Sequence, residues 1–114
     1  MQIKEIANTL CARILTPGLD VTTEVNNAFS SDLMSDVLTR DYDKTVLITG
    51  LSTLQAIRTA EMSDINHIII GRNKQVTTEM VDLALESEIV LLKSEYSLFR
   101  ISGILFKAGI KAMY

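Results

Sequence analysis

The stretch "TVLITGLST", residues 45–53, decides the fold. Residues 46–48 are a continuous apolar run, Thr49 and Gly50 end it, and Ser52 and Thr53 precede a helical pattern. This order predicts a buried strand, a tight turn and a helix. It suits a phosphate-binding turn and an ordinary strand-to-helix turn equally, so both interpretations stay open at this point.

The same alternation of element types continues along the chain. Buried strands are predicted at 68–70 and 89–92, and helices at 53–62, 77–86 and 96–108, with Thr77 as an N-cap and Gly109 as a C-terminal stop. Weaker patterns upstream predict the following elements: a helix at 3–10, strands at 12–15 and 25–29, a helix at 33–38, and turns at 16–18 and 41–43. We therefore expect an α/β fold, a three-layer βαβ domain over residues 1–114 with a mostly parallel sheet of about five strands.

Composition excludes several classes of function. The 114 residues are 47% apolar and 22% charged, as in a folded domain, and the net charge of −3 without a basic run argues against nucleic-acid binding. One cysteine and one histidine exclude an intrachain disulfide and a cysteine zinc or iron–sulfur site, so we expect no metal or cofactor. We expect a cytoplasmic protein without a signal peptide or membrane partner, since no apolar run approaches ~20 residues.

The predicted ligand-binding edge is the one where the parallel strands end, because ligands bind there in open sheets of this class. Four polar or glycine-bearing turns would meet at this edge: residues 30–32, 50–53, 71–73 and 94–96. Their convergence is the main functional signal in the pattern.

Each turn allows a binding and a structural interpretation. The turn at Gly50 lacks the second glycine and the lysine of a P-loop, but N–H groups near Ser52 and Thr53 could hold an anion, or one hydroxyl could cap the helix. After Gly71, Arg72 could bind a phosphate or carboxylate through a bidentate pair of hydrogen bonds. The alternative is a solvated turn residue.

The other two turns also allow both a binding and a structural interpretation. Ser31 and Asp32 could contact a ribose or a metal, although capping of the next helix is the favoured role. Tyr96 could stack on a base or pack at the start of the last helix.

No catalytic arrangement can be read from the sequence. His67 directly precedes the predicted strand at 68–70, at the end opposite the proposed site, and is interpreted as structural. Cys11 is interpreted as an inert side chain. Because no Ser-His-Asp set or carboxylate pair is recognisable, we expect a non-enzyme.

The last predicted helix is more apolar than one buried face requires. Its apolar residues are Leu98, Phe99, Ile101, Ile104, Leu105, Phe106 and Ile110. Contact with a second copy would explain this band, with Gly103 permitting close approach; the alternative is a helix deep inside the domain.

Several segments together resemble the DRTGG domain. They are "IKEIANTLCARIL" (3–15), "AFSSDLMSDVL" (28–38), "TVLITG" (45–50), "LQAIRTAEMSDINHIIIG" (54–71) and "TTEMVDLALESEIVLLKSEYSLFRISGIL" (77–105). That family occurs alone and fused to CBS-domain pyrophosphatases and phosphotransacetylases. The characteristic Asp-Arg is replaced here by Leu51-Ser52, and the Thr-Gly-Gly by Ile70-Gly71-Arg72.

The resemblance implies a fold like the N-terminal domain of HPr kinase/phosphorylase, without that protein's catalytic P-loop domain. Together with the apolar last helix, it leads us to expect a non-catalytic regulatory module that dimerises and senses a nucleotide or another phosphorylated metabolite. Where the motif departs, the implied ligand is a different one or none. Stand-alone members are associated with iron-only hydrogenases. The alternative it implies is therefore an interaction subunit for such a redox enzyme.

Overall fold

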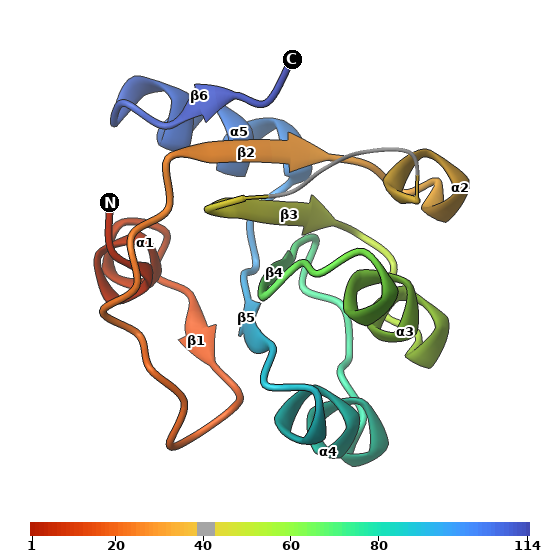
Figure 1. The fold of residues 1–114 in the computed structure, drawn as a ribbon. Helices are drawn as coiled ribbons and strands as arrows, with labels where there is room; N and C mark the ends of the chain where they lie inside the picture. The colour runs from red at the N-terminus through yellow and green to blue at the C-terminus, as the bar shows by residue number, and fades with distance from the viewer. Residues whose placement is uncertain (39–42) are drawn as a thin grey trace.

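The computed structural model describes residues 1–38 and 43–114 and arranges them as one mixed sheet with helices on both faces (Figure 1). Two residues of the turn predicted at 41–43 lie outside this part. The helices are α1 (Ile3–Thr9), α2 (Met34–Val37), α3 (Leu54–Met62), α4 (Thr78–Glu86) and α5 (Leu98–Lys107). The strands are β1 (Arg13–Ile14), β2 (Asn27–Ser30), β3 (Thr45–Thr49), β4 (His67–Ile70), β5 (Val90–Lys93) and β6 (Lys111–Ala112).

The sheet order is β1-β5-β4-β3-β2-β6, and every pair except β1–β5 is parallel. The prediction of a three-layer, mostly parallel α/β fold is therefore confirmed, with six strands instead of about five. The additional strand β6 pairs with Asn27 and Ala28 of β2. The strand predicted at 25–29 begins two residues later, at Asn27, because the Val25 N–H donates to the Met1 carbonyl instead of to a neighbouring strand.

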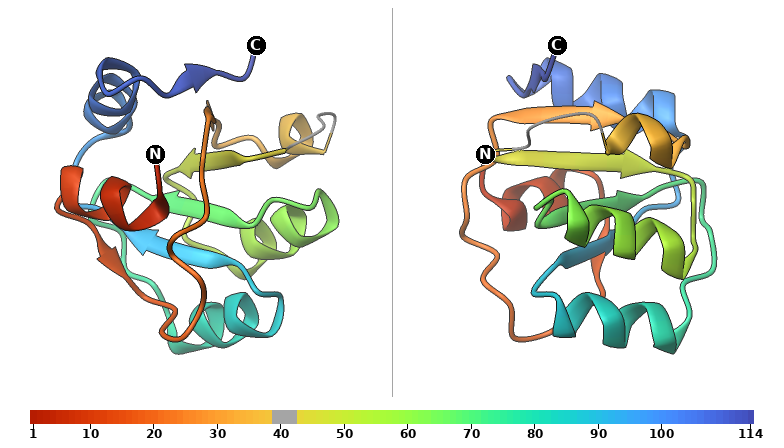
Figure 2. Two further views of the ribbon diagram at one scale, coloured as in Figure 1. Left: turned by 60° about the vertical axis from the view of Figure 1, so that its left-hand side comes forward. Right: turned by 45° about the vertical axis from the view of Figure 1, so that its right-hand side comes forward.

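The two faces of the sheet carry different helices (Figure 2). Alternate strand residues such as Ile48 and Ile69 pack with α1 and α5, whereas Leu47 and Ile68 pack with α2, α3 and α4. The chain moves across the sheet from β2 to β5 with helices on one face and then returns to β6 through α5. Since parallel crossovers are right-handed, reversing this direction puts α5 on the opposite face.

Local capping fixes where the main helices begin and end. The Thr77 hydroxyl accepts a hydrogen bond from the Met80 N–H at 3.2 Å, which confirms Thr77 as the N-cap of α4. The last helix begins at Leu98, two residues later than predicted, because Ser97 caps it. Gly109, at φ +106°, follows its C-cap as predicted. No helix in the described part of the chain is long and apolar enough to cross a bilayer.

Candidate ligand-binding site

The four predicted turns do lie at the edge where the parallel strands end, each directly after one of β2, β3, β4 and β5. Direct contacts join three of them through Asp32, Gly50 and Arg72, and the backbone of Tyr96 joins the fourth. The contacts within this junction of Asp32, Gly50 and Arg72 define which ligands the edge could bind.

The carboxylate of Asp32 is the centre of the junction. Its Oδ1 accepts hydrogen bonds from the backbone N–H of Gly50 at 2.6 Å and from the Thr49 hydroxyl at 3.0 Å. The same hydroxyl oxygen accepts the Leu51 N–H at 3.1 Å. One carboxylate thus organises the turn after β3, where the chain leaves the sheet for α3.

The capping role that the sequence favours for Ser30, Ser31 and Asp32 is wrong. The short helix α2 begins at Met34, and its N-cap residue, Leu33, makes no side-chain capping bond. Ser31 bonds both backbone groups of Leu33, with its hydroxyl donating to the carbonyl at 3.1 Å and accepting the N–H at 3.0 Å. Asp32 is used by the neighbouring strand instead, because Gly50 presents a buried N–H that needs an acceptor.

Arg72 closes the junction from the turn after β4. Its Nη2 lies 3.4 Å from Asp32 Oδ2 and donates to the Gly50 carbonyl at 3.3 Å. Its side chain remains 45% exposed, so the guanidinium also faces solvent. A Cβ on Gly50 would overlap this guanidinium, which is why glycine is required for the close approach. Arg72 and Asn73 both have left-handed φ values, +62° and +53°.

The hydroxyls of Ser52 and Thr53 are already engaged. Thr53 accepts the Ala56 N–H at 3.2 Å, which confirms that this turn caps α3, and Ser52 donates to the Gln75 carbonyl at 2.5 Å. Within the described residues, the N–H groups of Leu54 and Gln55 in the first turn of α3 have no acceptor. Backbone donors, rather than these hydroxyls, are what this turn offers an anion.

Gly71 and Tyr96 hold the turns after β4 and β5 together. The Arg72 N–H donates to the Tyr96 carbonyl at 2.8 Å. A Cβ on Gly71 would lie 2.8 Å from Ile101 Cδ1 and 3.2 Å from the Tyr96 carbonyl, so this position is tightly packed.

The ring of Tyr96 already has a cationic partner. The guanidinium carbon of Arg100 lies 3.8 Å from the ring centroid and covers one face of the ring. Interaction with the Cys11 side chain raises the pKa of the Tyr96 hydroxyl. A base would have to use the other face or displace Arg100.

His67 lies at the start of β4, at the opposite edge, as predicted. It lines a cavity of about 360 Å³ with Asp20, Asn66 and Glu88 among others. Burial lowers the pKa of His67, only partly offset by a hydrogen bond to the Thr45 backbone and by the Asp20 charge, so the imidazole is neutral at pH 7. Within the described residues, no group of three or more His, Cys, Asp or Glu side chains could hold a metal ion.

Two cationic residues at the binding edge, Arg13 and Lys93, escaped the sequence reasoning, whereas Asn73 belongs to the predicted turn at 71–73. Arg13, Asn73 and Lys93 line a cavity of about 260 Å³ together with Cys11 and Glu95. Arg13 reaches this edge only because β1 runs antiparallel to β5 and pairs it directly with Lys93. That long-range register leaves no local signal in the sequence.

The fold and this edge define the class: an open, mostly parallel α/β domain whose polar turns converge beyond the strand ends. Among solved structures, the chain is similar to the CBS and DRTGG domains of the regulatory region of Clostridium perfringens pyrophosphatase, complexed with its activator diadenosine tetraphosphate. The TM-score is 0.71 at 13% identity, over 96% of this chain and 47% of that one.

The similarity confirms, at the level of the fold, the resemblance to DRTGG domains that the sequence indicates. The chain spans about half of the length of that structure. No protein-family model matches the chain, and no curated protein sequence does so either.

Proposed function

We propose that this protein is a non-catalytic, cytoplasmic regulatory domain that binds a nucleotide or another phosphorylated metabolite at the edge where its parallel strands end. The observation that carries the proposal is the junction of Asp32, Gly50 and Arg72, in which one half-exposed cation connects three turns. The pyrophosphatase region of the same fold, complexed with a nucleotide activator, supports a regulatory role.

The proposed site comprises residues from all four turns: Ser31, Asp32, Gly50, Ser52, Thr53, Gly71, Arg72 and Tyr96. A ligand phosphate would compete with the Asp32 carboxylate for the Arg72 guanidinium, since Arg binds both anions in the same geometry. Rotation of Arg72 toward the ligand would release its bond to the Gly50 carbonyl. Ligand binding would thereby alter the contacts between the turns after β2, β3 and β4, which is a means of regulation.

A non-catalytic role is favoured by the distribution of reactive groups. His67 and Cys11, the chain's histidine and cysteine, line cavities at opposite edges of the sheet. They therefore cannot form a Cys–His pair. At the junction the Thr49 hydroxyl does donate to the Asp32 carboxylate, but Thr49 is buried and its oxygen accepts the Leu51 N–H, so this hydroxyl is not exposed to a substrate as a nucleophile would be.

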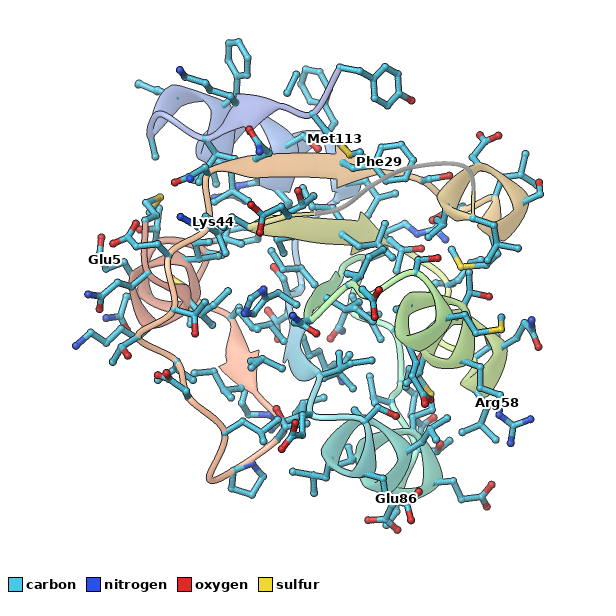
Figure 3. All side chains as sticks on the ribbon, viewed as in Figure 1. Glu5, Phe29, Lys44, Arg58, Glu86 and Met113 are labelled. Atoms are coloured by element: carbon cyan, nitrogen blue, oxygen red, sulfur yellow. The ribbon has the colours of Figure 1, made fainter. Side chains whose placement is uncertain are left out.

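Thermal unfolding in the presence of adenine and guanine nucleotides and sugar phosphates tests this function. A ligand at about 100 times its dissociation constant adds ~2.7 kcal/mol, so we expect one compound to raise the midpoint by several degrees. The Arg72→Ala/Ser52→Ala double variant should lose that shift, because Arg72 supplies the cation of the site and the Ser52 hydroxyl holds the Gly50 turn against the Gln75 carbonyl. Arg58→Ala is the matched control, because Arg58 points away from the sheet on the outside of α3 (Figure 3).

A flat panel for the wild-type protein would contradict the proposal. An unchanged shift in the double variant would contradict the assignment of the site to Ser52 and Arg72. The unfolding midpoints of Arg72→Ala/Ser52→Ala and Arg58→Ala are first compared with that of the wild type in the absence of ligand, so that a lost ligand shift is not confused with a loss of stability.

We also propose that the protein forms a homodimer through α5. Ile101, Leu105 and Ile110 of the apolar band are buried within the chain, but Phe99 is 90% exposed and Phe106 is 70% exposed. The two rings flank Ser102 and Gly103, two turns apart and about 10 Å along the axis. In an antiparallel pair of α5 helices crossing at Gly103, each Phe99 would face Phe106 of the second copy, as an isologous interface requires.

Sedimentation equilibrium tests the dimer. We expect a mass twice the 12.7 kDa of the chain, and we expect Phe99→Asp to reduce it to the monomer, since a carboxylate would be buried against the second copy. Met62→Asp is the control, because Met62 is an exposed apolar residue on α3. A monomeric wild-type protein would instead favour the alternative, a docking subunit for a redox enzyme such as an iron-only hydrogenase.

A further inference from the structure

The crevice between β4 and β5 is the topological switch point of this sheet. The chain leaves β4 toward α4 on one face and leaves β5 toward α5 on the other. In open α/β sheets, ligands bind beyond the strand ends at the point where such connections diverge. Hydrogen bonds from Arg72 to Tyr96 and from Asn73 to Ser94 tie the two turns together here.

A cavity of about 260 Å³ opens beside these tied turns. Asn73 from the turn after β4, and Lys93 and Glu95 at the end of β5, form one side, and Cys11 and Arg13 form the other. The volume is below the range of about 300–1,000 Å³ that holds whole drug-sized ligands. It suits one or two phosphoryl groups rather than a complete nucleotide.

Two like charges face each other at this cavity. Arg13 and Lys93 are directly opposite each other across the antiparallel β1–β5 pair, where like charges repel. Within residues 1–38 and 43–114, neither cation has a carboxylate within 4.0 Å, and Glu95 shares the lining without pairing with them. An anion between Arg13 and Lys93 would be attracted by both and would offset their mutual repulsion. The carboxylate of Glu95 would oppose binding of that anion.

We propose that this cavity is the phosphoryl-binding subsite of the protein, with the anion held between Arg13 and Lys93 and the Asn73 amide donating to it. This inference rests on the proposed function, in that the phosphoryl group would belong to the phosphorylated ligand bound at this edge. It assigns the anionic part of that ligand to residues outside the Gly50 turn. Arg72, next to Asn73, would then contact the part of the ligand that projects from the cavity.

Inorganic phosphate is the probe for this subsite, titrated at constant ionic strength into the ¹⁵N-labelled protein while amide chemical shifts are followed. We expect saturable shifts at Arg13, Asn73 and Lys93. In Arg13→Gln/Lys93→Gln, the affinity should fall about tenfold or more, because two charge-assisted contacts are lost. The substitution removes a like-charge repulsion, so the variant should fold at least as stably as the wild type.

The control is Lys4→Gln/Arg58→Gln, which also lowers the net charge by two, from −3 to −5, at exposed positions on α1 and α3. Its affinity for phosphate should equal that of the wild type. An equal loss in both double variants would reduce the effect to general charge and overturn the subsite.

Two further outcomes separate this inference from the proposed function. Saturable phosphate shifts at residues 52–55 and Arg72 that persist in Arg13→Gln/Lys93→Gln would overturn the cavity assignment and leave the proposed function intact. Absence of saturable shifts in the wild type would also overturn the subsite. The proposed function would then fail as well only if the nucleotide and sugar-phosphate panel were flat.

Discussion

Asp32→Ala should lower the free energy of unfolding by about 2 kcal/mol, measured by urea denaturation at neutral pH. The substitution leaves the Gly50 N–H and the Thr49 hydroxyl without their acceptor, and Gly50 is buried. The ion pair with Arg72 contributes little of this loss, because its side chains are 45% and 39% exposed and salt screens them. Most of the effect should therefore come from the hydrogen bonds.

Two variants separate this account from a general effect of charge. Asp32→Asn keeps an acceptor oxygen for Gly50 and should be less destabilising than Asp32→Ala. Asp82→Ala removes an exposed carboxylate from α4 and should change stability by no more than about 0.5 kcal/mol. If Asp32→Ala were as mild as Asp82→Ala, the carboxylate would not be the organising group of the junction.

Gly71→Ala should also destabilise the protein by about 2 kcal/mol, because the new Cβ is forced into a filled space. It would lie 2.8 Å from Ile101 Cδ1, 2.9 Å from Leu98 Cδ2 and 3.2 Å from the Tyr96 carbonyl. The two side chains belong to the helix that packs on the sheet, and the carbonyl accepts the Arg72 N–H, so none of them moves freely.

Gly50→Ala is the matched substitution, one strand away. The three atoms nearest to a Cβ at position 50 all belong to the end of the Arg72 side chain, which can swing into solvent at the cost of an exposed ion pair. We expect this variant to lose less than about 1 kcal/mol. Equal losses for Gly50→Ala and Gly71→Ala would show that the packing around Gly71 is looser than the contacts indicate.

The central strands and the helices beside them could be predicted from the sequence, because the patterns that specify them lie within a few residues of one another. The apolar run at 46–48 and the one at 68–70 can only be buried on both faces, and the hydroxyls of Thr53 and Thr77 act on N–H groups three residues away. The edge strand β6 has no such signal. Its two residues, Lys111 and Ala112, are exposed, and only pairing with β2 makes them a strand.

The candidate site was predicted to the level of its turns but not of its contacts. Asp32 has the local features of a helix cap, and only the tertiary structure gives it Gly50 and Arg72 as partners. The pairing of Arg13 with Lys93 depends on an antiparallel register between segments far apart in the chain. Long-range register decides such contacts, whereas periodicity and capping patterns report only on neighbours along the chain.

The most direct test of the ligand-binding edge is an amide NMR titration of the wild-type protein with adenine and guanine nucleotides and sugar phosphates. The account predicts saturable shifts, for at least one compound, that cluster in residues 50–55, 71–73 and 93–96. Shifts that cluster instead around His67 and Asn66 at the opposite edge would contradict it, as would spectra that no compound changes.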